Sequence, residues 1–427
     1  MSSGPLRKCV LIVPDGAADL YRDAAGRSPM AAASTPNQDW LAAQGVSGRM
    51  QTLYPDLPPG SVVAQMGMLG WDPYLYGSQG RSAWELLARG DVDVRDGDLI
   101  FRANLVQLEG RRLISYNAGN IPSRQAAPLV ERVNAALATE FPQLELYHSS
   151  DFRNILIIRQ GWSDPLAFDC LEPHEREGDE LDTAHLVAGR DGASAKVAEM
   201  LNRYLARVIE LLAGEPANGL IPWSAASSIA LPSFHSQTGF TGRAAIVGSM
   251  HFLHGIAKLG GIEFFPVGNG RPDTDYTAKG ARVVELLHRG FGFVVCHING
   301  PDEASHMRDV EAKIRSLEAI DHHIVGPVVE YFRERPEELG GVMVVPDHYT
   351  NVHPGSGAAR TQAHSLHPVP FVLWNGRDRD ATRRFDEDEA REGRYGAVPV
   401  SHLRLLDLLG VRGSSPAAAE SQAEALV

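Results

Sequence analysis

Short apolar runs that end in acidic or histidine-containing turns are the feature that most constrains the fold of this chain. Continuous runs of Val, Ile and Phe are typical of parallel strands buried on both faces, and helical stretches separate these runs. The alternation predicts an α/β core in which helices sandwich a mostly parallel sheet. The clearest strand-like runs are Lys8–Val13, Phe291–Val295, Gly341–Val345 and Val369–Trp374, and the predicted helices are Asn37–Gln44, Gly248–Leu259, Ala278–Arg289 and Val310–Arg333.

The middle of the chain has a different pattern, with short strand-like pieces at Leu113–Tyr116, Leu144–His148 and Asn154–Arg159. We interpret residues 105–200 as a smaller α+β domain, inserted into a core formed by residues 1–104 and 201–412. Gly, Pro, Ser and Ala dominate Gly214–Ser233, which we interpret as the connection back to the core. Residues 413–427 are expected to form a flexible tail.

Charge and cysteine content limit the partners and the compartment. The formal net charge is −13, so nucleic acid and anionic membranes would be repelled at long range, and neither is expected as a partner. A small anionic substrate would therefore have to be held locally, by metal ions or by a few arginines. Three cysteines are too few for a disulfide framework, and no secretory signal or membrane-length apolar segment is visible. These features predict a cytoplasmic protein, and its oligomeric state is left open.

Six carboxylate and imidazole side chains mark the predicted strand ends and turns: Asp15, Asp302, His306, Asp347, His348 and His364. Asp302 and His306 are one helical turn apart, so on a helix both can face one cation. A single Asp-His pair is more often a cap beside a surface histidine. Several pairs at the carboxyl ends of strands in one sheet instead indicate a centre of two divalent ions. Mixed oxygen and nitrogen ligands favour Zn²⁺ or Mn²⁺, with Mg²⁺ as the alternative.

Ser61 follows Pro58-Pro59-Gly60 and precedes a predicted helix. One interpretation is that the serine is only the N-cap of this helix. The other is that it is a nucleophile, because a helix N-terminus attracts a phosphoryl group and a bound metal lowers the pKa of a hydroxyl. Spacing alone does not decide between the two.

Ordered motifs over residues 8–408 resemble those of the archaeal-type cofactor-independent phosphoglycerate mutases, members of the alkaline phosphatase superfamily. They include Pro14-Asp15-Gly16, Pro58-Pro59-Gly60-Ser61, Gly80-Arg81-Ser82, Phe101-Arg102-Ala103-Asn104, Leu231-Pro232-Ser233-Phe234 and Asp347-His348. The resemblance implies an alkaline-phosphatase-like core that binds two divalent ions. One ion would be bound by Asp302, His306 and His364, and the other by Asp15, Ser61, Asp347 and His348. Ser61 would take the phosphoryl group from the substrate, and the phosphoserine would pass it to another hydroxyl or to water.

The resemblance also implies substrate contacts. Arg153 and His174 match family positions in the inserted domain, with an exposed pair on a charged loop as the alternative. Arg81, Arg102 and Lys279 match positions in the core, where a structural salt bridge is an equal alternative for the two arginines.

Departures from the family pattern bear on the substrate. Val62 and Gln65 stand where the family carries an acidic residue and a histidine, and the turn before Leu231 is altered. Asn117 and Asn120 lie where the family has an arginine-rich run, and asparagine offers neither charge nor a guanidinium fork. We therefore expect a phosphomutase acting on a small phosphorylated acid other than, or in addition to, phosphoglycerate. The alternatives are a metal-dependent phosphohydrolase or phosphonate-processing enzyme of specialised metabolism, and a non-catalytic homologue.

Overall fold

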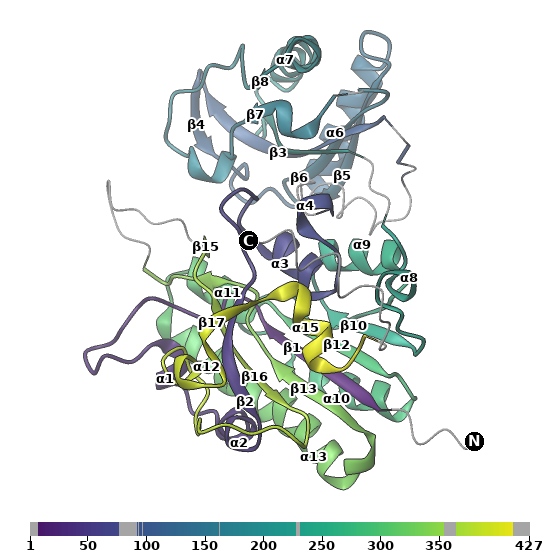
Figure 1. Cartoon of the computed structure of the whole chain (residues 1–427). Coiled ribbons are helices and arrows are strands. Elements are labelled where there is room, and N and C mark those ends of the chain that lie inside the picture. Colours follow the sequence, from purple (N-terminus) through teal and green to yellow (C-terminus); the bar gives the residue numbers. More distant parts are fainter. Residues whose placement is uncertain are drawn as a thin grey trace. The chain divides into compact units, whose positions relative to one another are not determined.

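The computed structural model describes residues 7–76, 92, 94–95, 97–161, 163–227, 231–353 and 364–412. The chain divides into two compact units (Figure 1). Met1–Gly77 and Leu231–Val427 form the first, here called the core unit, and Ser78–Ala230 form the second, the small unit. Within the described residues, every helix is too short or too polar to cross a membrane.

The core unit is built on an eight-stranded, mostly parallel sheet, as predicted. Only β16 runs against its neighbours in the sheet. The apolar runs seen in the sequence supply the central strands, in which every residue of β1 and β12 is buried. The order is β11 (Glu263–Pro266), β10 (Ala244–Gly248), β12 (Phe293–Ile298), β1 (Lys8–Pro14), β13 (Leu339–Val344), β16 (Val369–Trp374), β2 (Val46–Gln51) and β17 (Tyr395–Ser401).

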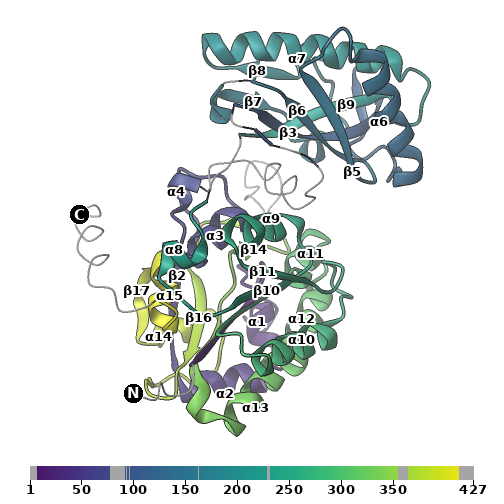
Figure 2. The ribbon, with the colours of Figure 1, turned by 90° about the vertical axis from the view of Figure 1, so that its right-hand side faces the viewer.

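Helices cover both faces of this sheet (Figure 2). α9 (His251–Gly260) and α15 (Leu405–Leu409) pack on one face. The other face is covered by α2 (Pro36–Gln44), α10 (Tyr276–His288), α12 (Val310–Ile320) and α13 (Gly326–Glu334). The expected α/β sandwich is therefore confirmed.

The single helix predicted over Val310–Arg333 is interrupted by a π-helical turn at Asp321–Val325. Here the backbone approaches α10 so closely that a Cβ on Gly280 would lie 1.9 Å from the His323 carbonyl oxygen. Asp321 also accepts hydrogen bonds from the backbone N–H groups of Asn37 and Gln38, at 3.1 and 2.8 Å. The turn thus holds the start of α2, a long-range contact that periodicity within one segment does not reveal.

The small unit contains an antiparallel sheet of five strands, consistent with the predicted α+β composition. Its apolar core lies between the sheet and two helices, α6 (Ser123–Leu137) and α7 (Gly192–Leu211). An Asp191–Ser194 capping box fixes the start of α7. The strands are β3 (Leu99–Glu109), β4 (Arg112–Ser115), β5 (Leu144–Ser150), β6 (Arg153–Ile158) and β9 (Gly219–Ser227).

β9 corrects the interpretation of Gly214–Ser233 as a connection. Leu220 and Ile221 are buried, and the strand pairs with β3 along Leu99–Val106. Pro222 is compatible with a strand here because, among the described residues, β9 pairs only with β3. Because β3 and β9 are partners in one sheet, the small unit begins before residue 105 and ends after residue 200.

Candidate active site

Three neighbouring strands bring acidic and imidazole side chains to one edge of the core sheet. β1 lies between β12 and β13, and the register pairs Val13 with His297. Asp15 follows β1 directly, and Asp347 comes shortly after β13. Because the strands are parallel, their carboxyl ends meet at the same edge. The structure brings together all six predicted ligand residues at this position.

The first group consists of Asp302, His306 and His364. Asp302 lies in the first turn of α11 (Gly300–His306), and His306 is its last residue. His364 is added by β15 (His364–Ser365), which pairs with β14 (Tyr349–Thr350). His306 Nε2 lies 3.4 Å from Asp302 Oδ2, and His364 Nε2 lies 3.5 Å from Asp302 Oδ1 and 3.3 Å from His306 Nε2.

These separations fit one shared cation. Ligand atoms about 2.1 Å from a tetrahedral zinc ion lie roughly 3.4 Å apart, and a catalytic zinc site has three protein ligands and one open position. The triangle formed by Asp302, His306 and His364 has edges of this length. The donor set can therefore hold a divalent ion with a position left for a substrate oxygen.

The second group surrounds the Ser61 hydroxyl. His348 Nε2 lies 3.4 Å from Asp15 Oδ1 and 3.7 Å from Asp347 Oδ2. Ser61 Oγ is 3.1 Å from this nitrogen and 3.5 Å from Asp15 Oδ2. The second group of oxygen and nitrogen donors can thus hold a second cation beside the serine.

Ser61 is the first residue of α3 (Ser61–Met68), and Gly60 is the N-cap. The interpretation of Ser61 as the N-cap is therefore wrong: Gly60 occupies that position, and the Ser61 hydroxyl lies beside Asp15 and His348. Gln65, one turn further along α3, is fully buried, and its Nε2 lies 3.4 Å from Asp347 Oδ2.

Thr350 joins the two groups. Its hydroxyl donates to Asp302 Oδ1 at 2.7 Å and lies 3.0 Å from His348 Nδ1. Because a hydroxyl has one proton, His348 Nδ1–H must be the donor in the second contact, which leaves His348 Nε2 unprotonated beside Ser61. Gly16 permits this packing: it has φ +61°, and a Cβ there would lie 2.5 Å from Thr350 Oγ1.

Charge and burial also favour bound cations. Asp15, Asp302 and Asp347 are each at most 9 % exposed, and burying three carboxylates without compensating charge is costly. Burial lowers the pKa of His348 to about 4, so the imidazole is a neutral ligand near pH 7. Burial opposes ionisation of Asp302, but the contacts with His306 and His364 outweigh it and hold the pKa of this carboxyl well below its usual value.

His297 in β12 was not among the predicted ligands. It is completely buried, and its Nε2 lies 3.3 Å from Asp15 Oδ2. The one signal in the sequence is a polar residue inside an apolar strand, which more often marks a structural histidine. Burial lowers the pKa of His297 to about 4.

The predicted substrate-binding residues are divided between the two units. Lys279 is fully buried in the core unit, where its Nζ donates to the His297 carbonyl oxygen at 3.2 Å and burial lowers its pKa. Arg102 was expected in the core but lies in β3 of the small unit, because β3 pairs with β6 and β9 of that unit's sheet. Its guanidinium lies 4.4 Å over the Trp223 ring, and that of Arg153 lies 4.2 Å over Phe152. The other two are His174, whose ring lies 5.5 Å from that of Trp223, and Arg81, which is outside the described residues.

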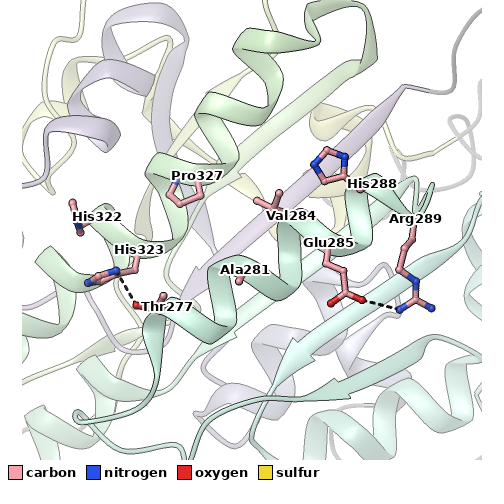
Figure 3. Close-up of a pocket in the computed structure, with 9 residues that line it drawn as sticks. All are labelled: Thr277, Ala281, Val284, Glu285, His288, Arg289, His322, His323 and Pro327. Carbon is pink, nitrogen blue, oxygen red and sulfur yellow. Dashed lines mark hydrogen bonds and ion pairs between the residues drawn. The ribbon is translucent and has the colours of Figure 1, made fainter.

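A separate groove on the core unit is lined by α10, the π-helical turn and Pro327 (Figure 3). His288, His322 and His323 border it, and none of the predicted ligands does. His323 Nδ1 is within 3.0 Å of Thr277 Oγ1, and Glu285 accepts a hydrogen bond from Arg289 at 3.2 Å. The groove is thus distinct from the acidic site.

The matching family model and similar curated relatives have the same family description. The family model described as 2,3-bisphosphoglycerate-independent phosphoglycerate mutase matches residues 42–218. The protein of that name from Methanosarcina barkeri is 31% identical over 417 residues, which cover 95% of this chain and 98% of the relative. The 2,3-bisphosphoglycerate-independent phosphoglycerate mutase 2 from Methanothermobacter thermautotrophicus is 30% identical over 410 residues, which cover 93% of this chain and 96% of the relative.

Solved structures agree on the fold. The PH0037 protein from Pyrococcus horikoshii has a TM-score of 0.72 at 26% identity, with 97% of this chain and 100% of that chain covered. The cofactor-independent phosphoglycerate mutase from Thermoplasma acidophilum has a TM-score of 0.58 at 23% identity, with 95% and 100% covered.

Proposed function

This chain belongs to the 2,3-bisphosphoglycerate-independent phosphoglycerate mutase family, and from that premise we propose that it is a cation-dependent phosphomutase in which Ser61 accepts the phosphoryl group. The observation that carries the proposal is the position of the serine hydroxyl, 3.1 Å from His348 Nε2 and 3.5 Å from Asp15 Oδ2. A serine at the start of a helix and against buried carboxylates is suited to phosphoryl transfer once cations offset the negative charge.

Two divalent ions, Zn²⁺ or Mn²⁺ by the donor set, would supply that positive charge and lower the pKa of the serine hydroxyl. Asp302, His306 and His364 would hold one ion, and Asp15, Asp347, His348 and Ser61 the other. The chain's own contribution is to fix these groups before substrate arrives. Thr350 orients both Asp302 and His348, and the first N–H groups of α3 offer donors to the phosphoryl oxygens.

The substrate is a small phosphorylated acid, and its acid end would be held by the small unit. Arg153, His174 and Arg102 are the proposed contacts there, with Arg81 and Lys279 as further candidates. In the loop that carries arginines in the family, the asparagines bond within the loop: Asn117 Nδ2 donates to Asn120 Oδ1 at 2.8 Å, and Asn117 Oδ1 accepts from Ser115 Oγ at 2.8 Å. Without that charge, a substrate other than phosphoglycerate, or hydrolysis of the phosphoserine by water, becomes competitive.

The test is to incubate manganese-loaded and zinc-loaded protein with a panel of phosphorylated acids and phosphonates, and to follow isomers and free phosphate by ³¹P NMR. We expect an isomerised product from at least one acid, and a loss of at least roughly 10³-fold in rate for Ser61→Ala. Free phosphate alone would indicate the hydrolase alternative, and undiminished turnover by Ser61→Ala would remove the serine from the mechanism.

A further inference from the structure

His297 is a buried polar side chain whose hydrogen-bonding capacity is unused within the described part of the chain. It is 0 % exposed, and neither Nδ1 nor Nε2 has a hydrogen-bond partner there. Buried polar groups are almost always satisfied, so an imidazole with two unused nitrogens calls for an explanation.

Of the two ring nitrogens of His297, Nε2 is the one near the Asp15 carboxylate. Nε2 lies 3.3 Å from Asp15 Oδ2, close enough for a hydrogen bond, yet the direction of the ring N–H does not satisfy one. One ligand atom from each of Asp15, His297 and Asp347 lies within 4.8 Å of the others. Donor atoms that lie this close together without hydrogen bonding to His297 can be bridged by a cation bound among them.

The position of His297 is fixed by its neighbours. The β1–β12 register pairs it with Val13, two residues before Asp15. Lys279 Nζ binds its carbonyl oxygen, and the Phe252 ring packs edge-on against the imidazole with the centroids 6.2 Å apart. The imidazole is therefore held in place before any ion binds, as a ligand would be.

We propose that His297 is a further protein ligand of the cation site built on Asp15 and Asp347. The inference rests on the proposed function only in that it requires a cation at this site. It assigns the second site an additional imidazole nitrogen, which favours Zn²⁺ or Mn²⁺ over Mg²⁺.

His402 provides a matched control in the same unit. It is also 0 % exposed, and both of its ring nitrogens lack hydrogen-bond partners among the described residues. Unlike His297, it belongs to none of the clusters of described residues that could hold a metal ion. The ring that lies near it is that of Tyr54, with centroids 5.4 Å apart. A purely structural role for buried histidines would make His297 and His402 behave alike.

The experiment uses full-length protein loaded with ¹¹³Cd²⁺, with cation content measured by elemental analysis and each site observed by ¹¹³Cd NMR. We expect two resonances from the wild type. His297→Gln should lose or shift one of them and leave the other unchanged, while His402→Gln should keep both. In His297→Cys, a thiolate ligand should move the affected resonance downfield, which a residue that only packs would not do. Circular dichroism spectra confirm that each variant is folded.

Two results would overturn the inference: both resonances unchanged in His297→Gln, or neither moved in His297→Cys. A wild-type protein that binds no cation would instead refute the proposed function, so the two failures can be told apart.

Discussion

Thr350 shows how one hydroxyl can organise two groups of ligands. It touches Asp302 of the first group and His348 of the second, and it is completely buried. Groups that hold a metal ligand by hydrogen bonds typically change metal affinity by 10–100-fold when they are removed. The contact is therefore expected to matter for both proposed cations, although Thr350 would touch neither.

Thr350→Val removes the hydroxyl and keeps the shape of the side chain. We expect it to weaken cation binding by about 10-fold or more, because Asp302 and His348 lose their orienting partner. Chelator competition with the purified protein measures this change. Thr350→Ser keeps the hydroxyl and should retain near wild-type affinity. Equal affinity in the valine and wild-type proteins would show that the hydroxyl does not orient the ligands.

The spacing of residues in the sequence predicted some of the candidate cation ligands but not all of them. Asp302 and His306 lie one turn apart on α11, so their pairing could be predicted from spacing. His364 is brought close to them by the pairing of β14 with β15, which the residues around His364 do not predict. His297 went unassigned because a single polar residue in a buried strand is more often structural.

Among the elements, α12 is tied to the loop after β1 by a buried ion pair. Lys313 Nζ donates to Asp19 Oδ2 at 2.8 Å and to the Thr350 carbonyl oxygen at 2.8 Å, and both charged residues are 0 % exposed. The pair therefore links a helix on one face of the sheet to β14, which carries Thr350.

Lys313→Met should lower the free energy of unfolding by about 3–5 kcal/mol, because it leaves the Asp19 carboxylate buried without its partner. Denaturant titration measures the loss. The double variant Asp19→Asn with Lys313→Met should recover part of it, since the unpaired charge is then absent. A loss below about 1 kcal/mol in the single variant would mean that the pair contributes no more than a surface salt bridge.

Element prediction succeeded where apolar runs were long and failed where partners were distant. The central strands β1 and β12 follow directly from their Val and Ile content. β9 was missed because Pro222 and small residues resemble a connection, and only its pairing with β3 makes it a strand. The π-helical turn was missed for the same kind of reason, since the close approach to Gly280 comes from a different helix.

At the scale of the whole molecule, a chain with a formal charge of −13 would handle an anionic substrate by concentrating positive charge locally. The core unit supplies the carboxylates and imidazoles that can hold divalent ions. The small unit supplies Arg102 and Arg153, each placed over an aromatic ring. Candidate ligands for cations and candidate contacts for an anion are therefore found in different units.

Anomalous X-ray diffraction from crystals grown with Mn²⁺ would show whether two cations flank the Ser61 hydroxyl. Two anomalous peaks are expected. One should lie among Asp302, His306 and His364, and the other among Asp15, Asp347 and His348 within reach of Ser61 Oγ. Crystals with manganese in the solvent but no anomalous peak at either group of ligands would contradict this expectation.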